Sequence, residues 1–164
     1  RRLSGKVGVV VGGSCWWDLR LPVPPKYKDE QERLIDLLRQ APAHLSRMLG
    51  VPVIHASHAG DFEGLTPGNE SMPYPSRYLG EAQITDGRGK VLAHMTYEDG
   101  EGVITADITP GQVAGALEPI PEGFWIREIP PGATRAWEYL NPFGQKYYAT
   151  TFRPLLERDS SGYS

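Results

Sequence analysis

The side chains of this sequence best suited to chemistry are its only cysteine, Cys15, and two histidines, His55 and His58. A cysteine thiolate is a strong nucleophile, and an imidazole beside it can take the thiol proton. A pair formed by Cys15 and His55 would therefore be one route to a thiol hydrolase. A reactive thiol also needs a cation nearby, and only Arg20 is close enough in sequence to serve. The alternative for Cys15 is a small buried thiol packed behind a pocket.

The spacing of His55 and His58 also bears on metal binding. On a strand, side chains three positions apart point to opposite faces, so the two rings would not readily share one ion. A single cysteine provides neither a multi-cysteine metal site nor an internal disulfide. We predict no metal and no cofactor, with one histidine facing a pocket to hydrogen-bond a substrate or a carboxylate. Purely structural roles for both histidines are the alternative.

An apolar strand is expected to position these side chains. Val9 to Val11 places three β-branched residues in a row, the pattern of a strand buried on both faces within an α/β fold. Gly12 and Gly13 then leave room for a ligand above the end of the strand. Residues 51–60 repeat this pattern. Ligands in open α/β sheets bind at the carboxyl ends of strands, so we predict substrate-binding roles for Ser14, Cys15, Trp16, His55 and His58.

The following residues predict the elements around this pocket. Leucines recur at helical spacing over residues 29–49, Gly50 is a natural stop, and Pro42 predicts a kink or a break. Residues 61–77 are rich in Gly, Pro and Ser and predict a long loop with a functional role. Short strands are expected at 79–85, 90–95 and 103–108.

Two features near these strands have competing interpretations. Adjacent side chains at a strand end point in opposite directions, so we expect one of Trp16 and Trp17 in the pocket wall and the other in the core. Glu81 follows Gly80 near the start of a strand, where its carboxylate could hydrogen-bond the backbone of the pocket. An exposed position at the sheet edge explains Glu81 equally well.

The composition excludes several classes of protein. At 164 residues, with 40% apolar and 23% charged residues, the chain is about one soluble globular domain. The formal charge of -3 and the scattered Lys and Arg argue against a nucleic-acid partner. The sequence has neither an apolar run of the roughly 18 residues that cross a membrane nor the apolar core of a signal peptide. We therefore expect a cytoplasmic protein with a small-molecule substrate and no membrane partner.

Four motifs follow one another within residues 1–109. A strand ends in Gly-Ser-x-Trp at Trp16, and a long helix follows it. A strand Val-Pro-Val-x-x-Ala then begins at Val51, and a hairpin Gly-x-x-x-Ile-x-Asp-x-x-Gly-x-Val-Leu-Ala runs from Gly80 to Ala93. In this order the motifs resemble the nitrilase or carbon-nitrogen hydrolase superfamily. The resemblance implies an α/β fold that is the C-terminal half of an α-β-β-α sandwich.

The resemblance also implies a reaction. That family hydrolyses nitriles, amides or carbamoyl groups through a cysteine thioester, with a lysine and a glutamate beside the cysteine. The glutamate and the lysine would lie upstream of Arg1, so neither is assigned in this chain. The implied partners are a small-molecule substrate and an N-terminal half of the same fold.

Two alignments with the family are open for Cys15. In the first, Cys15 is the nucleophile, since the family's cysteine is often followed by an aromatic residue and an acid, as Trp16 to Asp18 are here. This match is one residue too long and lacks the helix and buried strand that must precede the next long helix. In the second, residues 7–17 are that buried strand, residues 1–4 end the intervening helix, and the nucleophile lies upstream. We favour the second alignment, which leaves the catalytic residues unknown.

The domain organisation follows from these alignments. Residues 1–109 are predicted to form the half-sandwich, and residues 110–164 an aromatic-rich extension that packs on the domain or on a neighbouring subunit of a homo-oligomer. The predicted activity is hydrolysis of a non-peptide carbon-nitrogen bond. The competing class is a non-catalytic assembly module, in which the extension mediates assembly and the pocket is vestigial.

Overall fold

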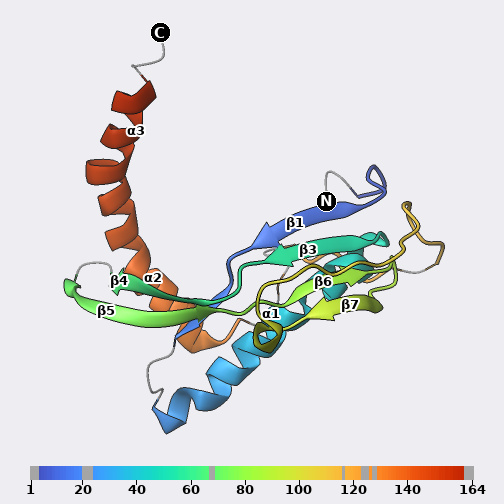
Figure 1. Cartoon of the computed structure of the whole chain (residues 1–164), viewed down its shortest axis with the longest axis horizontal. Helices are drawn as coiled ribbons and strands as arrows, with labels where there is room; N and C mark the ends of the chain where they lie inside the picture. The colour runs from blue at the N-terminus through green and yellow to red at the C-terminus, as the bar shows by residue number, and fades with distance from the viewer. Residues whose placement is uncertain are drawn as a thin grey trace.

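A four-stranded sheet forms the part of the molecule drawn on the right in Figure 1. The computed structural model describes residues 4–19, 24–66, 69–115, 117–122, 126 and 129–160. The strands of the sheet, in spatial order, are β1 Val10–Ser14, β3 Val53–Ser57, β6 Ala82–Thr85 and β7 Val91–Met95. β1 and β3 are parallel, and the other neighbours are antiparallel. The carboxyl ends of β1 and β3 therefore meet at one edge of the sheet.

Helix α1, Pro25–Leu49, lies in the crossover that the parallel pair β1 and β3 requires. It packs against β3 and β6 and buries Ala41, Ala43 and Met48. The helix ends as the sequence predicts, because Gly50 adopts a left-handed conformation and its N–H donates to the carbonyl of Ser46. One helix layer on one mixed sheet confirms the predicted α/β class, and half of an α-β-β-α sandwich has this arrangement.

Pro42 does not break α1, which is continuous through it. The proline is buried, so the contacts of its ring offset the backbone hydrogen bond that it cannot make. Near the end of the helix the hydroxyl of buried Ser46 donates to the carbonyl of Val51 at 2.8 Å and also contacts the carbonyl of Asp86. These contacts fix the helix to the turn between β6 and β7.

The prediction of a loop at residues 61–77 is wrong, because the described residues of this range form most of a hairpin. The second sheet has the order β2-β5-β4, with β2 Trp17–Leu19, β5 Asn69–Tyr78 and β4 Asp61–Thr66. Phe62 stacks on Tyr78 with ring centroids 4.4 Å apart, and Trp17 packs against Phe62 and Tyr74. Such cross-strand aromatic pairs stabilise a sheet despite the glycines and prolines that argued for a loop.

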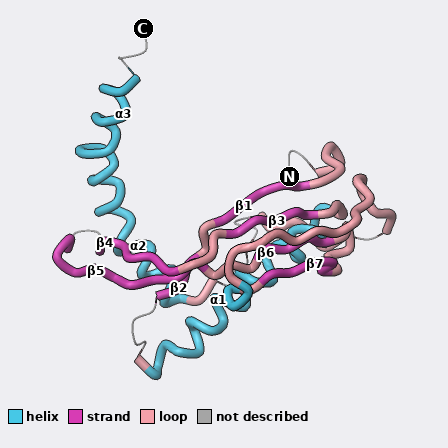
Figure 2. Tube along the Cα trace, viewed as in Figure 1, coloured by secondary structure: helices cyan, strands magenta, loops and turns pink. Residues whose placement is uncertain are grey.

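The prediction of a strand at residues 103–108 is also wrong. These residues have no regular secondary structure and belong to the long segment that follows β7 (Figure 2). The segment starts beside β7, near Met95, and reaches the residues before β1, where the N–H of Gly111 donates to the carbonyl of Gly8 at 2.8 Å. It therefore spans the sheet from one edge strand toward the other instead of adding a strand.

The prediction that Val9 to Val11 is buried on both faces is wrong for this chain. Val11 is 70% exposed, and Val9 and Val10 are only partly buried. β1 is an edge strand, and α1 packs mainly against β3 and β6, so the faces of β1 have less cover than those of the central strands. Of the predicted helix end at residues 1–4, only Ser4, in a turn, falls within the described residues.

Within the predicted extension of residues 110–164, residues 131–160 are helical and project from the sheets (Figure 1), whereas Gly111 and Glu118 bind the main chain of Gly8 and Arg47. The helical part consists of α2 Pro131–Tyr147, the π-helical turn η2 Tyr148–Phe152 and α3 Arg153–Ser160. Its base contacts α1, where the N–H of Gly132 donates to the carboxylate of Glu30 at 2.7 Å. Its large apolar side chains are exposed, Trp137 and Tyr139 most of all. Within the described part of the chain, no helix is long and apolar enough to cross a membrane.

Candidate functional site

Ser14 and His55 meet at the carboxyl ends of β1 and β3. The two strands pair with Gly12 opposite His55 and Ser14 opposite Ser57. The Oγ of Ser14 lies 2.9 Å from Nε2 of His55. The Nδ1 of His55 lies 3.3 Å from the main-chain carbonyl oxygen of Glu81. One imidazole thus joins β1 and β3 to the residue that precedes β6.

The Glu81 carbonyl determines the tautomer of His55. A carbonyl oxygen only accepts hydrogen bonds, so Nδ1 of His55 carries the proton and donates it. In a neutral imidazole the other nitrogen is then an acceptor, and Nε2 accepts the hydrogen bond of the Ser14 hydroxyl. His55 is therefore oriented as a base toward the Oγ of Ser14.

Burial keeps His55 in its neutral form. Desolvation lowers the pKa of His55 below its usual 6.5, and the hydrogen bond to the Glu81 carbonyl offsets part of that effect. The indole of Trp16 stacks on the imidazole, with ring centroids 5.0 Å apart and an angle of 28° between the planes. Trp16 therefore covers one face of the base, whereas Trp17 contacts the aromatic side chains of the second sheet.

His58 binds the main chain of Ser14, not its hydroxyl. The amide nitrogen of His58 lies 3.2 Å from the carbonyl oxygen of Ser14, and its Nδ1 lies 3.1 Å from the same atom. The ring also packs against Tyr78, with centroids 5.2 Å apart. Since β3 ends at Ser57, the alternation of a strand does not govern His58, and both histidines reach Ser14.

Cys15 is exposed rather than buried and does not pair with His55. Both ring nitrogens of His55 already have partners, Ser14 and Glu81, so the pair of Cys15 and His55 considered from the sequence is not formed. Arg20, the candidate cation beside the thiol, lies outside the described residues. The structure thus brings together four of the five predicted side chains and directs the fifth, Cys15, toward solvent.

Glu81 is buried and ion-paired, so the exposed edge position is wrong. Its carboxylate accepts a hydrogen bond from Nε of Arg39 at 2.9 Å and lies 2.5 Å from Nε2 of His94. The side chain is 3% exposed, and an unpaired charge there would be costly. Its φ of 56° lies in the left-handed region that residues other than glycine rarely adopt. The ion pair with Arg39 and the contact with His94 therefore stabilise the unusual backbone whose carbonyl orients His55.

Sequence reasoning missed Arg39 and His94 as partners of Glu81. Arg39 lies 42 positions before Glu81, on the helix that packs against β6, and His94 lies on the neighbouring strand. Neither has a local pattern that marks it as a partner. The one usable signal is the hairpin, which predicts that residues near 81 and 94 face each other.

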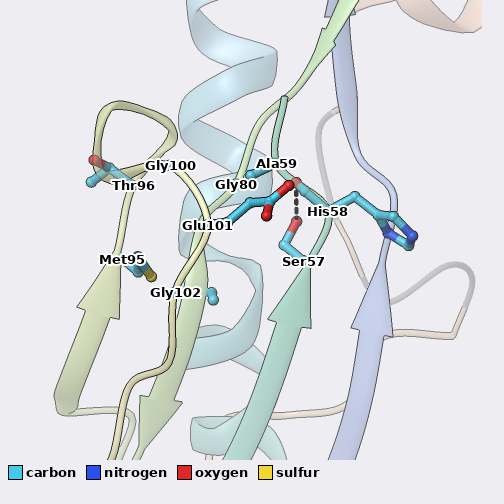
Figure 3. A pocket seen from close by; sticks show the side chains of 10 residues that line it. Ser57, His58, Ala59, Gly80, Met95, Thr96, Gly100, Glu101 and Gly102 are labelled. Atoms are coloured by element: carbon cyan, nitrogen blue, oxygen red, sulfur yellow. Dashed lines mark hydrogen bonds between the residues drawn. The ribbon is translucent and has the colours of Figure 1, made fainter. Parts of the chain in front are cut away.

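A cavity of about 260 Å³ opens beside the end of β3 (Figure 3). Ser57 and His58 line one side of it, and Thr96 and Glu101 from the segment after β7 line another. In Figure 3 the carboxylate of Glu101 points toward Ser57, whereas the ring of His58 points away from the cavity toward β1. This volume is below the roughly 300–1,000 Å³ of typical ligand pockets, and the residues that line it are those of β3, β6 and β7 and of the segments next to them, not Ser14, Trp16 or His55.

The arrangement favours acid-base and nucleophilic chemistry by side chains. Among the residues that the structure describes, no three His, Cys, Asp or Glu side chains gather where they could hold a metal ion. At the carboxyl ends of β1 and β3, groups that could act on a substrate include the Ser14 hydroxyl, the His55 imidazole and the exposed thiol of Cys15.

A comparison with solved structures finds proteins of similar fold. The crystal structure of a carbon-nitrogen hydrolase from Helicobacter pylori G27 is similar to this chain, at 15% sequence identity and a TM-score of 0.44. The match covers 91% of this chain and 41% of that chain, so this chain spans less than half of that protein's length. No protein-family model matches the sequence. No curated protein matches it either.

Proposed function

We propose that this chain forms the substrate-binding wall of a hydrolase that acts on non-peptide carbon-nitrogen bonds. The observation that carries the proposal is the meeting of Ser14, Trp16 and His55 at the carboxyl ends of two parallel strands. Polar groups at such an edge bind small molecules in α/β folds. The reaction class comes from the order of sequence motifs that resembles the carbon-nitrogen hydrolases, and it is an analogy with that family.

The proposal places the catalytic cysteine, lysine and glutamate in a partner segment upstream of Arg1. Exposed apolar side chains lie at both edges of the sheet, Val11 on β1 and Val91 and Leu92 on β7. Val91 and Leu92 are adjacent and point to opposite faces, so one segment would cover only one of them. In the proposal, an N-terminal half of the same fold covers Val11 on β1 and completes the active site.

The structure around Cys15 supports this placement of the nucleophile. The resemblance implies a helix directly after the catalytic cysteine, whereas Trp17–Leu19 here forms the strand β2. The thiol is exposed, and the histidine that could serve as its base binds Ser14. We therefore assign Cys15 to the edge of the pocket.

Ammonia release from small amides and nitriles tests the proposal. The 164-residue chain alone should release none, and a polypeptide that also carries the natural sequence upstream of Arg1 should release it. In the longer protein, Trp16→Ala should raise KM about tenfold, because it removes the indole that stacks on His55 and uncovers one face of the imidazole that the proposal places beside the substrate. Turnover by the chain alone that disappears in Cys15→Ser would overturn the proposal and make Cys15 the nucleophile.

A non-catalytic assembly module is the second candidate. The helical extension favours it, since Trp137, Tyr139 and Tyr147 are each more than half exposed. Aromatic side chains are enriched in interfaces between proteins. If the longer protein assembles through this extension and releases no ammonia from any amide or nitrile, the assembly role replaces the enzymatic one.

A further inference from the structure

Ser14 has the surroundings of a nucleophile. Its hydroxyl donates to Nε2 of His55 over 2.9 Å, and Nδ1 of His55 is held by the Glu81 carbonyl. A nucleophile within hydrogen-bond reach of a base, with the base oriented by a third group, is the diagnostic arrangement of nucleophilic catalysis. We propose that Ser14 is a nucleophile toward small carboxylic esters with good leaving groups, with His55 as its general base.

The supporting geometry keeps both groups ready to react. Ser14 is partly exposed, so a small ester can reach its hydroxyl. Trp16 holds the imidazole by stacking, and burial keeps the ring uncharged near neutral pH. The His58 amide and ring bind the Ser14 carbonyl and fix the main chain below the nucleophile.

The reaction balances with water as the second substrate. The Oγ of Ser14 bonds to the ester carbonyl carbon while its proton moves to Nε2 of His55. The bond from that carbon to the leaving oxygen breaks, and the proton passes from His55 to the alcohol or phenol that departs. Water then hydrolyses the acyl-serine, releases the carboxylic acid and restores the hydroxyl. This activity does not depend on the proposed carbon-nitrogen hydrolysis, whose nucleophile lies upstream of this chain.

Acetylation by p-nitrophenyl acetate tests the inference on the 164-residue chain, with the acetylated residue located by peptide mass mapping. Ser57 is the internal control, because it lies opposite Ser14 in the ladder but its hydroxyl donates to the carbonyl oxygen of His58 and not to an imidazole. In the native chain Ser14 should be acetylated at least about tenfold faster than Ser57, and in urea at an equal rate. His55→Gln should slow acetylation of Ser14 about 100-fold, the low end of what a general base contributes.

Three results would overturn the inference. One is a native ratio of Ser14 to Ser57 acetylation near one. Another is a folded His55→Gln chain that acetylates Ser14 at the wild-type rate. The third is acetylation confined to Cys15. Circular dichroism shows whether His55→Gln folds. If it does not fold, the ratio of Ser14 to Ser57 acetylation in the wild-type chain, compared between native buffer and urea, decides alone. Carbon-nitrogen hydrolysis is measured separately, by ammonia release from the longer protein, so either proposal can fail without the other.

Discussion

At the scale of single residues, the fold holds His55 in its neutral form. Its neutral ring accepts from Ser14, donates to the Glu81 carbonyl and stacks under Trp16. Each contact suits the uncharged imidazole, and burial lowers its pKa below 6.5. Protonation of Nε2 would remove the hydrogen bond that this nitrogen accepts from Ser14 and would place a positive charge in a partly buried position. The ring is therefore both the base of the site and a weak point of the fold in acid.

Acid should weaken the fold through His55. The pKa of His55 is lower in the folded chain than in the unfolded chain, so protonation of the ring favours unfolding. The free energy that the neutral ring contributes to stability is fully present above about pH 6.5. It is lost as the pH falls through the pKa of the folded chain. Urea unfolding of the wild type and of His55→Gln at about pH 7.5 and about pH 5.5 measures this difference. The wild type should lose more free energy of unfolding than the variant does over that interval. Equal losses of unfolding free energy in the wild type and the variant would contradict the lowered pKa of His55. A pKa of His55 at or above 6.5, measured by NMR titration, would contradict it as well.

Cys15 should react freely in the folded chain. Its side chain is exposed, so iodoacetamide meets no barrier of packing. We expect an alkylation rate within about threefold of the rate for the same chain unfolded in urea. A thiol that resists reagent until the chain unfolds would show that Cys15 is buried.

The sequence predicts those residues of the site that lie at the ends of the two apolar strands. Ser14, Cys15, Trp16, His55 and His58 were predicted together because two apolar strands end at them. In the structure Ser14 contacts His55 and His58, Trp16 stacks on His55, and Cys15 is exposed. The role of Glu81 could not be predicted, since its partners lie on other elements and its left-handed backbone is stabilised by them. Pairing across such separations leaves no local pattern in the sequence.

At the scale of elements, the approach to β6 depends on Gly80. This residue has a φ of 69°, and a Cβ added to it would lie 2.9 Å from the amide nitrogen of Tyr97. The next residue, Glu81, is also left-handed. Gly80 therefore sets the path of the chain that carries the Glu81 carbonyl to His55.

Gly80→Ala should destabilise the protein more than Gly5→Ala. Both glycines are left-handed, but nothing lies within 4 Å of a Cβ at Gly5. The left-handed conformation costs alanine about 1 kcal/mol at either position, and the collision with Tyr97 should add about 2 kcal/mol at Gly80. The free energy of unfolding in urea measures both, and equal losses would show that the backbone near Tyr97 yields without cost.

The elements themselves were predictable to different degrees. The end of α1 at Leu49 and the strands of the hairpin near 82–85 and 91–95 follow from local signals, which are leucine spacing, Gly50 and the turn at Asp86. The hairpin of β4 and β5 was missed because its glycines and prolines argue for a loop, while the aromatic pairs that stabilise it join β2, β4 and β5. Only tertiary contact reveals such pairs.

At the scale of the whole molecule, exposed apolar strands give the account its main consequence. Val11 lies on the edge strand β1 and is 70% exposed. In the proposed complete protein an upstream half covers this strand. The same substitution at Val11 should therefore act differently in the 164-residue chain and in the longer protein.

Val11→Glu should cost the chain alone less than about 0.5 kcal/mol of unfolding free energy, as is usual for an exposed position. In the longer protein it should cost about 2 kcal/mol or more, because the carboxylate would be buried without a partner. Val11→Thr, which keeps the shape of valine, is the matched control and should cost less than Val11→Glu in the longer protein. Equal costs of Val11→Glu in both polypeptides would show that no upstream segment covers β1.

The measurement that tests the central claim most directly is the position of the acyl group during amide hydrolysis. The longer protein is mixed with a small amide that it hydrolyses, quenched in acid within one turnover and mapped by peptide mass. The account predicts an acyl thioester on a cysteine upstream of Arg1, with Cys15 unmodified. An acyl group on Cys15 would contradict it and would place the nucleophile within this chain.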